Sequence, residues 1–323
     1  MSSRPVLLAE VVRSGYVEGT HHGSVVALRP DGSVALALGD LDRPVFPRSS
    51  NKPLQAVGLL EAGWQPASEE QLALATASHS GEPGHLAVVR EILTGAGEAA
   101  LGNPAMLPLD QAAAEALLAS GGHASRLTMN CSGKHAAMLA TCLANGWPLA
   151  GYLDPEHPVQ RSCRAAIERL ADEPVRHIAV DGCGAPQHAL TLPGLARAFT
   201  ALTGATPHER RTAQAMRSRP WYVGGTGRDV TRLMEGVPGL VAKDGAEGVY
   251  AAVLADGSSV ALKIEDGAGR ARTPVLVAAL RALGVMAPVL DELATTDVLG
   301  GGSRVGEVRV AGELADLSLG LLA

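Results

Sequence analysis

The sequence predicts an α+β protein in which an antiparallel sheet is built from both ends of the chain, with a helical region inserted between them. Segments near both termini are short, rich in β-branched residues and separated by Asp-Gly turns. The middle of the chain instead shows apolar residues at helical spacing. Neither terminal region has enough strands to form a stable sheet alone, so we expect the two to pair.

The first strands are predicted over residues 6–12, 24–28 and 33–38, the last two joined by a turn at Pro30-Asp31-Gly32. Near the other end we expect strands over residues 240–243, 249–254, 260–264 and 305–310, and a helix over 274–283. The helices expected between them are residues 52–62, 85–94, 111–118, 132–144, 159–170, 195–202, 209–218 and 228–234. We therefore predict one unit over residues 1–323, with a sheet subdomain of about 1–45 plus 237–323 and a helical subdomain of about 46–236.

Composition excludes several classes of function. Apolar residues make up 46% of the 323, enough for a large core, while the net charge of −6 and 3% aromatic residues lack the basic surface and stacking side chains of nucleic-acid binders. No segment is long enough to span a membrane, and the first apolar run is too short for a secretory signal. We therefore expect a cytoplasmic protein whose four cysteines stay reduced.

Lysine is scarce: four lysines, Lys52, Lys134, Lys243 and Lys263, accompany twenty-three arginines. A lysine can lose its proton and act as a base or a metal ligand, whereas an arginine cannot. Codon bias is the alternative explanation for the scarcity. Lys243 precedes a glycine-rich turn, and the sequence leaves its role open, a solvated charge being one interpretation. Lys263 lies in an apolar strand and needs a partner if it faces inward.

Ser49 and Lys52 are three residues apart where a proline-containing loop gives way to a predicted helix. Residues at this spacing face the same way on a helix, so the lysine can activate the serine hydroxyl. A plain helix cap at Ser49 or Ser50 explains the pattern as well. The segment 77–82 adds Ser78, His79 and Ser80, which either reach a cleft or form an ordinary turn.

Cys131 stands three residues before Lys134 at the start of a predicted helix, and Cys183 follows a β-like segment within a glycine-rich turn. Thiols in such places suit nucleophilic attack or zinc binding. The alternative is that a cysteine is a small buried hydrophobe, the role we expect for Cys142 and Cys163.

Six motifs in order carry a specific resemblance: Arg48-Ser49-x-x-Lys52, Ala77-Ser78-His79-x-Gly81-Glu82, residues 129–135, residues 181–186, Gly225-Thr226-Gly227-Arg228 and residues 245–248. Together they resemble the Rhizobium-type L-asparaginase family over nearly the whole chain. The resemblance implies a fold similar to serine β-lactamases, penicillin-binding proteins and glutaminases, and it suggests a homodimer.

The resemblance also implies roles for residues. Ser49 would be the nucleophile with Lys52 as its base, and Ser78 would pair with Lys263 beside them. Cys131, Lys134 and Cys183 would hold zinc. The substrate-binding residues would be Arg48, His79, Asp181 and Glu247, with Arg48 gripping a carboxylate through its planar guanidinium.

The sequence therefore predicts a single catalytic unit that hydrolyses L-asparagine to L-aspartate and ammonia. A β-lactamase or other amidohydrolase on the same scaffold is the first alternative, although no Lys-Thr-Gly triplet occurs. The second alternative is a non-catalytic protein that binds zinc or an amino acid. The sequence leaves open the choice between Ser78 and Ser80 and that between asparagine and glutamine.

Overall fold

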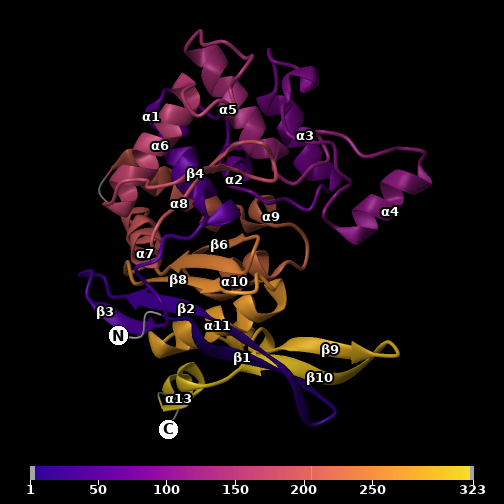
Figure 1. The fold of residues 1–323 in the computed structure, drawn as a ribbon. Helices are drawn as coiled ribbons and strands as arrows, with labels where there is room; N and C mark the ends of the chain where they lie inside the picture. Colours follow the sequence, from indigo (N-terminus) through magenta and orange to yellow (C-terminus); the bar gives the residue numbers. More distant parts are fainter. Residues whose placement is uncertain (1–3, 205, 321–323) are drawn as a thin grey trace.

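An eight-stranded antiparallel sheet forms the lower half of the computed structural model, which describes residues 4–204 and 206–320 (Figure 1). Its strands run in the order β6-β7-β8-β2-β1-β10-β9, and β3 also pairs with β2. They are β1 (Val6–Arg13), β2 (Tyr16–Leu28), β3 (Val34–Leu38), β6 (Val241–Gly245), β7 (Val249–Val253), β8 (Ser259–Ile264), β9 (Thr296–Gly300) and β10 (Ser303–Val310). The α+β class and the pairing of both chain ends are thus confirmed.

The two ends of the chain meet along β2, which is long enough to serve three neighbours. Its first half pairs with β1, and its second half pairs with β8 on one side and β3 on the other. Gly23 lies at the change of partner, where an added Cβ would stand 2.3 Å from the carbonyl oxygen of Lys263, so only glycine fits. The predicted hairpin of residues 24–28 and 33–38 is confirmed.

The helical region lies between β3 and β6 in the sequence and above the sheet in Figure 1. Its elements are η1 (Arg48–Asn51), α1 (Lys52–Glu61), α2 (Glu69–Ala75), α3 (Pro83–Ile92), η2 (Glu98–Ala100), α4 (Gln111–Ala119), α5 (Ser132–Ala144), α6 (Pro158–Ala171), β4 (Ile178–Val180), β5 (Pro186–His188), α7 (Leu192–Ala201), α8 (Pro207–Ser218), α9 (Pro220–Val223) and α10 (Asp229–Gly236). After the sheet resumes come α11 (Gly269–Ala282), α12 (Pro288–Glu292) and α13 (Glu313–Gly320).

Local sequence explains where many of these helices begin. The side chains of Ser68, Asp110 and Thr191 accept hydrogen bonds from backbone N–H groups in the first turns of α2, α4 and α7. Several other helices start with proline, whose missing N–H group costs nothing in the first turn. The helix predicted from residue 274 starts five residues earlier, and Pro274 lies inside it.

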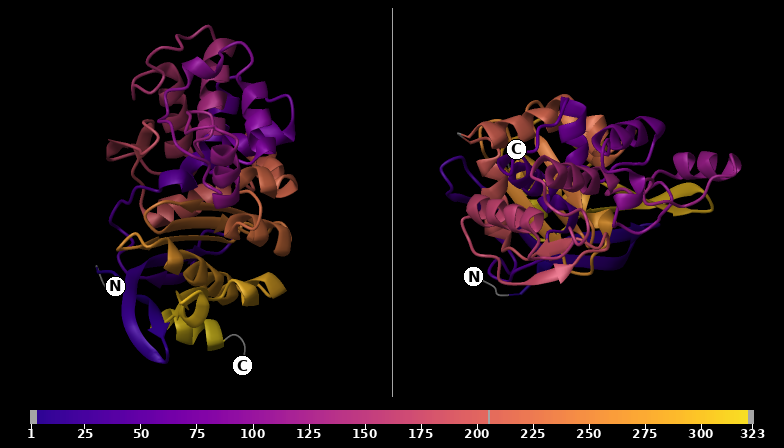
Figure 2. Two further views of the ribbon diagram at one scale, coloured as in Figure 1. Left: turned by 90° about the vertical axis from the view of Figure 1, so that its right-hand side faces the viewer. Right: turned by 90° about the horizontal axis from the view of Figure 1, so that it is seen from above.

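Helices cover both faces of the central strands. α7 packs against β2, β7 and β8, and α11 packs against β7, β8 and β10. Every residue of β6 and β7 is consequently buried. Figure 2 shows the resulting order of helical region, sheet, and α11 with α13.

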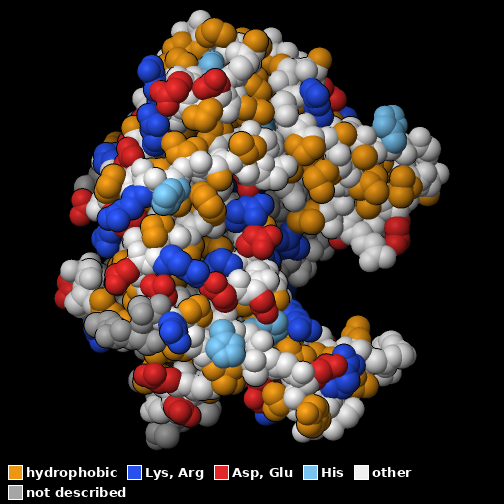
Figure 3. All heavy atoms as spheres, viewed as in Figure 1, with side chains coloured by type: hydrophobic (Ala, Val, Ile, Leu, Met, Phe, Trp, Pro, Cys, Tyr) orange, Lys and Arg blue, Asp and Glu red, His pale blue; other side chains and the backbone are white. Residues whose placement is uncertain are grey.

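Two projections extend from one side, the arm that carries α4 and the hairpin β9–β10, and the space-filling view shows a notch between them (Figure 3). Within the described residues no helix is both long and apolar enough to cross a bilayer.

The sequence prediction missed elements that are short or exposed. Residues 16–23 of β2 are mostly exposed and carry no clear apolar alternation, so only pairing with β1 makes them a strand. The strand β9 and the helices α2, α12 and α13 were likewise not predicted. The division into two subdomains stays a prediction, and α7 shows that part of the middle region packs directly on the sheet.

Candidate active site

The segment that contains Ser49 changes direction sharply at Arg48. Arg48 adopts a φ of 53°, a left-handed conformation that residues other than glycine rarely take. The chain then forms η1 and continues directly into α1, which begins at Lys52. Ser50 is buried and its hydroxyl donates to the carbonyl oxygen of Pro47 at 2.6 Å. The half-buried Ser49 hydroxyl has no hydrogen bond among the described residues, so Ser50 is the structural serine of the pair.

Lys52 points into the protein. Its side chain is 1% exposed, and Nζ donates to the carbonyl oxygen of Ala77 at 2.5 Å, to Ser78 Oγ at 3.1 Å and to Cys131 Sγ at 3.1 Å. These three partners account for all the N–H bonds of an ammonium group. No hydrogen bond joins Lys52 to Ser49 in the described contacts, although the two lie one turn apart.

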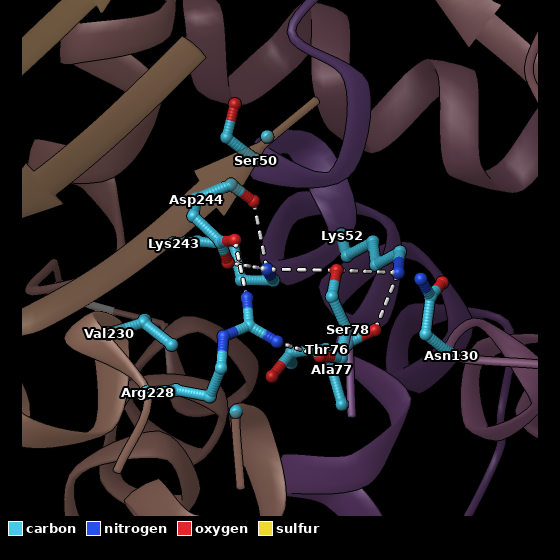
Figure 4. A network of polar contacts seen from close by, with 12 residues as sticks. Ser50, Lys52, Thr76, Ala77, Ser78, Asn130, Arg228, Val230, Lys243 and Asp244 are labelled. Atoms are coloured by element: carbon cyan, nitrogen blue, oxygen red, sulfur yellow. Dashed lines mark hydrogen bonds and ion pairs between the residues drawn. The ribbon is translucent and has the colours of Figure 1, made fainter. Parts of the chain in front are cut away.

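Ser78 is the meeting point of two lysines. Its hydroxyl lies 3.1 Å from Lys52 Nζ and 3.0 Å from Lys243 Nζ, and Figure 4 shows the two amines approaching it from opposite sides. The neighbouring Ser80 hydroxyl donates instead to the carbonyl oxygen of Gly224 at 2.9 Å. Of the two serines left open by the sequence, the structure therefore brings Ser78 to the lysines.

The structure does not bring Ser78 to Lys263, the pairing that the resemblance implies, but to Lys243, whose role the sequence left open. Lys243 is fully buried on β6, whereas Lys263 on β8 donates to the carbonyl oxygens of Glu247 and Ile264. The register places both lysines on the same face of the sheet, but β7 lies between their strands. Their strands are two strand spacings apart, about 9.6 Å, and Lys263 also lies two residues along β8 from Ala261, the position level with Lys243. Sequence alone shows a lysine in each strand and does not show which strand passes under Ser78.

Lys243 belongs to a buried ion cluster around Asp244. Lys243 Nζ donates to Asp244 Oδ1 at 2.5 Å, and Asp244 Oδ2 accepts from Arg228 at 2.9 Å and from Arg272 at 3.0 Å. Burial lowers the pKa of Lys243 to about 8, although the Asp244 carboxylate acts in the opposite direction. Burial alone would raise the pKa of Asp244, but the cations around it outweigh burial and hold that pKa below its usual range.

The three predicted metal ligands lie together behind Lys52. Cys131 and Cys183 are buried in one small cluster, and Lys134 Nζ lies 3.1 Å from Cys183 Sγ. A hydrogen bond from Cys131 and the charge of Lys134 lower the pKa of Cys183. Burial alone would lower the pKa of Lys134, but the neighbouring thiolate outweighs it and raises that pKa. His135 Nε2 is also buried without a hydrogen-bond partner in the described part of the chain.

This donor set suits zinc chemically, because thiolates and nitrogen donors are its usual ligands. Among residues 4–204 and 206–320, no group of three or more His, Cys, Asp and Glu side chains is arranged to hold a metal ion. The predicted set differs from such groups because its third donor is a lysine. Zinc therefore stays a prediction.

Of the predicted substrate-binding residues, Arg48, Asp181 and Glu247 lie together. Arg48 Nε donates to Asp181 Oδ1 at 2.7 Å, and Arg48 NH1 lies 3.7 Å from Glu247 Oε1. Glu247 also has a left-handed φ, of 58°, so both ends of this contact are held in a strained backbone. Arg48, Glu247 and Lys263 line a cavity of about 320 Å³.

His79 is separated from this group. It is fully buried, and its Nε2 lies 2.9 Å from Ser132 Oγ at the start of α5. Burial holds the pKa of His79 well below its ordinary value, so the ring is neutral. The position favours a role in packing the Ser78 segment against α5 rather than contact with a substrate.

The sequence reading did not recognise Lys243, Asp244, Arg228 and Arg272 as site residues. A signal for Lys243 and Asp244 was present in the sequence. The two charged residues end a short strand in which charged and apolar residues do not alternate, so one face of the strand cannot expose both of them to solvent. Arg228 was part of a motif quoted for the resemblance, whereas Arg272 on α11 has no local signal. Its place beside Asp244 depends on the packing of α11 against the sheet.

Comparison with known proteins agrees with the sequence resemblance at the level of the family. No curated protein matches the chain. The profile of L-asparaginase II matches residues 9–310, which includes every candidate site residue described above. Because this match covers most of the chain, the protein belongs to the L-asparaginase II family.

Proposed function

We propose that this protein hydrolyses L-asparagine to L-aspartate and ammonia through a serine nucleophile activated by lysine. Family membership supports hydrolysis of an amide. The observation that carries the serine–lysine mechanism is the Ser78 hydroxyl held between the amines of Lys52 and Lys243. Two buried amines so close together disfavour a charge on both, so one of them is available as a base.

Ser49 is the better nucleophile of the two serines for reasons of access. Its side chain is half-buried and its hydroxyl is free of competing bonds within the described chain, whereas Ser78 is only 6% exposed and already contacts two amines. Ser78 then serves as a relay. A proton leaves Lys52 through the Ser78 hydroxyl to Lys243, which leaves Lys52 as a free amine, one helical turn from Ser49 in the sequence.

The reaction proceeds in two halves. Lys52 takes the Ser49 hydroxyl proton as Oγ adds to the side-chain amide carbon, and the C–N bond then breaks as Lys52 returns that proton to the departing ammonia. Water next adds to the ester carbon, giving up its proton to Lys52, and the C–Oγ bond breaks as the proton returns to Ser49. The products are aspartate and ammonia, and Ser49 is regenerated.

In this proposal Arg48 and its two carboxylate partners bind the amino-acid end of the substrate, which their mutual contacts support. The guanidinium suits the α-carboxylate, and Asp181 and Glu247 suit the α-ammonium group. The position of Arg48 follows from the same turn that presents Ser49, because the two residues are immediate neighbours.

Zinc belongs to this proposal as a bound ion next to the reacting groups. Cys131, Lys134 and Cys183 would hold it, with the orphaned His135 nitrogen facing the same cluster. When bound, it would supply positive charge that helps position an anionic substrate group.

The test is ammonia release from asparagine and from glutamine, measured with and without a chelator on protein of known zinc content. We expect asparagine turnover that Ser49→Ala abolishes and the matched variant Ser50→Ala retains. Digestion of protein quenched during turnover should place the acyl group on Ser49. Hydrolysis of a chromogenic β-lactam without asparagine turnover would instead support the β-lactamase alternative. Wild-type turnover in Ser49→Ala would refute the assigned nucleophile.

A further inference from the structure

The buried ion cluster around Asp244 is larger than a lysine–carboxylate pair. One carboxylate oxygen receives Lys243, and the other receives both Arg228 and Arg272. Arg272 also lies 3.9 Å from Asp229, whose carboxylate accepts from Thr273. The arginines come from the start of α10 and from α11, so three separate elements meet at one strand end.

Charge balance in this cluster does not require a proton on Lys243. The two guanidinium groups always carry one positive charge each, and Asp244 and Asp229 supply two negative charges. Adding an ammonium group gives the buried cluster a net positive charge, which is costly in a medium of low polarity. The charge of Lys52, whose amine contacts the other side of the Ser78 hydroxyl, disfavours an ammonium group on Lys243 further.

The hydrogen bonds of Lys243 are also complete for a neutral amine. Two of its three partners, the backbone oxygen and the carboxylate of Asp244, can only accept. The third is the Ser78 hydroxyl, which can donate. A free amine can therefore donate twice and accept the Ser78 proton at its lone pair. Tyr250 also faces the cluster; it is fully buried, and burial raises the pKa of its hydroxyl, which keeps it neutral.

We propose that Arg228 and Arg272 are positioning residues for the Ser78–Lys243 pair: by engaging Asp244 they leave Lys243 free to act as an amine toward Ser78. Without them the carboxylate would hold the lysine as an ammonium partner. The lowered pKa of Lys243 agrees with this arrangement, since burial and Arg228 act in the same direction. The proposal goes beyond the proposed function and relies on it only for the consequence of a free amine in turnover.

The direct test uses the scarcity of lysine. Protein labelled with ¹³C or ¹⁵N at the lysine side chain should give signals from only four residues. The Lys243 signal is assigned by its loss in Lys243→Met. We expect it to titrate near pH 8 in the native protein, to titrate higher by about one unit or more in Arg228→Gln and Arg272→Gln, and to titrate lower in Asp244→Asn. The matched control is Arg232→Gln, which removes a surface arginine of α10 that pairs with Glu292. It should leave the titration of Lys243 unchanged.

The pH dependence of turnover provides a second test. If Lys243 must be a free amine, the acidic limb of kcat/KM moves to higher pH in the arginine variants, and activity at pH 7 falls about tenfold for each unit of that shift. Raising the pH restores the rate, which a merely distorted site would not do. Arg228→Lys and Arg272→Lys should return the limb toward its native position because they restore the charge.

Two results would overturn the proposal: a native Lys243 that titrates only in the ordinary lysine range, above about pH 10, or a Lys243 titration that neither arginine substitution shifts. The NMR titration needs no substrate. A protein that showed the expected shifts but released no ammonia would contradict the asparaginase proposal and leave the assignment of the arginines supported. If Arg272→Gln does not fold, Arg228→Gln gives the same reading from a more exposed side chain.

Discussion

Replacing Lys243 by methionine, beside Lys263→Met as a matched variant, tests which lysine serves Ser78. The sequence resemblance paired Ser78 with Lys263 and left the role of Lys243 open, and the structure places the two lysines on strands that β7 separates. Lys243 is fully buried with its amine 3.0 Å from Ser78 Oγ, whereas Lys263 is bonded to two backbone oxygens near the Glu247 turn.

The expected effect on turnover follows from the loss of a proton acceptor. A positioned general base contributes about 10²–10⁴ in rate, equivalent to roughly 3–5 kcal/mol in the activation barrier. We therefore expect kcat of Lys243→Met to fall by that factor. Lys263→Met should change kcat by less than about tenfold, because its amine does not touch a candidate catalytic group.

Stability should not explain the difference. Lys243→Met leaves Asp244 Oδ2 bonded to Arg228 and Arg272, and it removes a buried amine whose charge the cluster does not need. The backbone oxygen and Oδ1 of Asp244 each lose a donor, at a cost of about 1–3 kcal/mol per acceptor. A domain that is stable by about 5–15 kcal/mol tolerates this loss.

The assay is steady-state ammonia release from asparagine for both variants, with urea unfolding to confirm that each is folded. Equal losses of kcat in the two variants would contradict the assignment of Lys243. So would a folded Lys243→Met that keeps its rate within tenfold of the native protein.

Three further predictions follow from buried groups outside the Ser78 cluster. Burial lowers the pKa of His188 to about 4, so between about pH 6.5 and 4 the unfolded chain binds more protons than the folded protein. The free energy of unfolding therefore falls with falling pH, by up to roughly 3 kcal/mol. Urea unfolding across this range should show a weaker dependence of the unfolding free energy on pH in His188→Gln, and an unchanged dependence would refute the prediction. Gly133→Ala should destabilise by about 1–3 kcal/mol, because the added Cβ would stand 2.5 Å from a backbone oxygen of α2, whereas Gly269→Ala meets no atom within 4 Å and should be tolerated in the same unfolding assay. Cys183→Ser should reduce bound zinc measured by elemental mass spectrometry, while Cys163→Ser, in the apolar core, should keep it; equal zinc in both variants would contradict the proposed ligands.

Much of the fold could be predicted because its signals are local. Apolar periodicity and turn signals such as Pro30-Asp31-Gly32 identified most helices and the strands of the central sheet. Exposed segments such as β9 and residues 16–23 of β2 could not be predicted this way, because their mostly exposed side chains impose no regular apolar pattern. The homodimer and the cytoplasmic location remain predictions.

The candidate site divides along the same line. Short motifs on single elements, such as Ser49 with Lys52 or Cys131 with Lys134, were visible as spacings. The lysine partner of Ser78 was not visible, because it depends on which strand of the sheet passes next to Ser78 in the folded protein.

By itself the sequence determined the fold class, the family resemblance and a shortage of lysine that made each remaining lysine informative. Only the tertiary structure decided which lysine meets Ser78 and that Arg228 and Arg272 share its neighbour Asp244. The physical reason is that a side chain's charge and reactivity depend on the groups packed around it. Those groups come from α10, α11 and the sheet, which lie far from Ser78 in the sequence and meet only when the two ends of the chain pair.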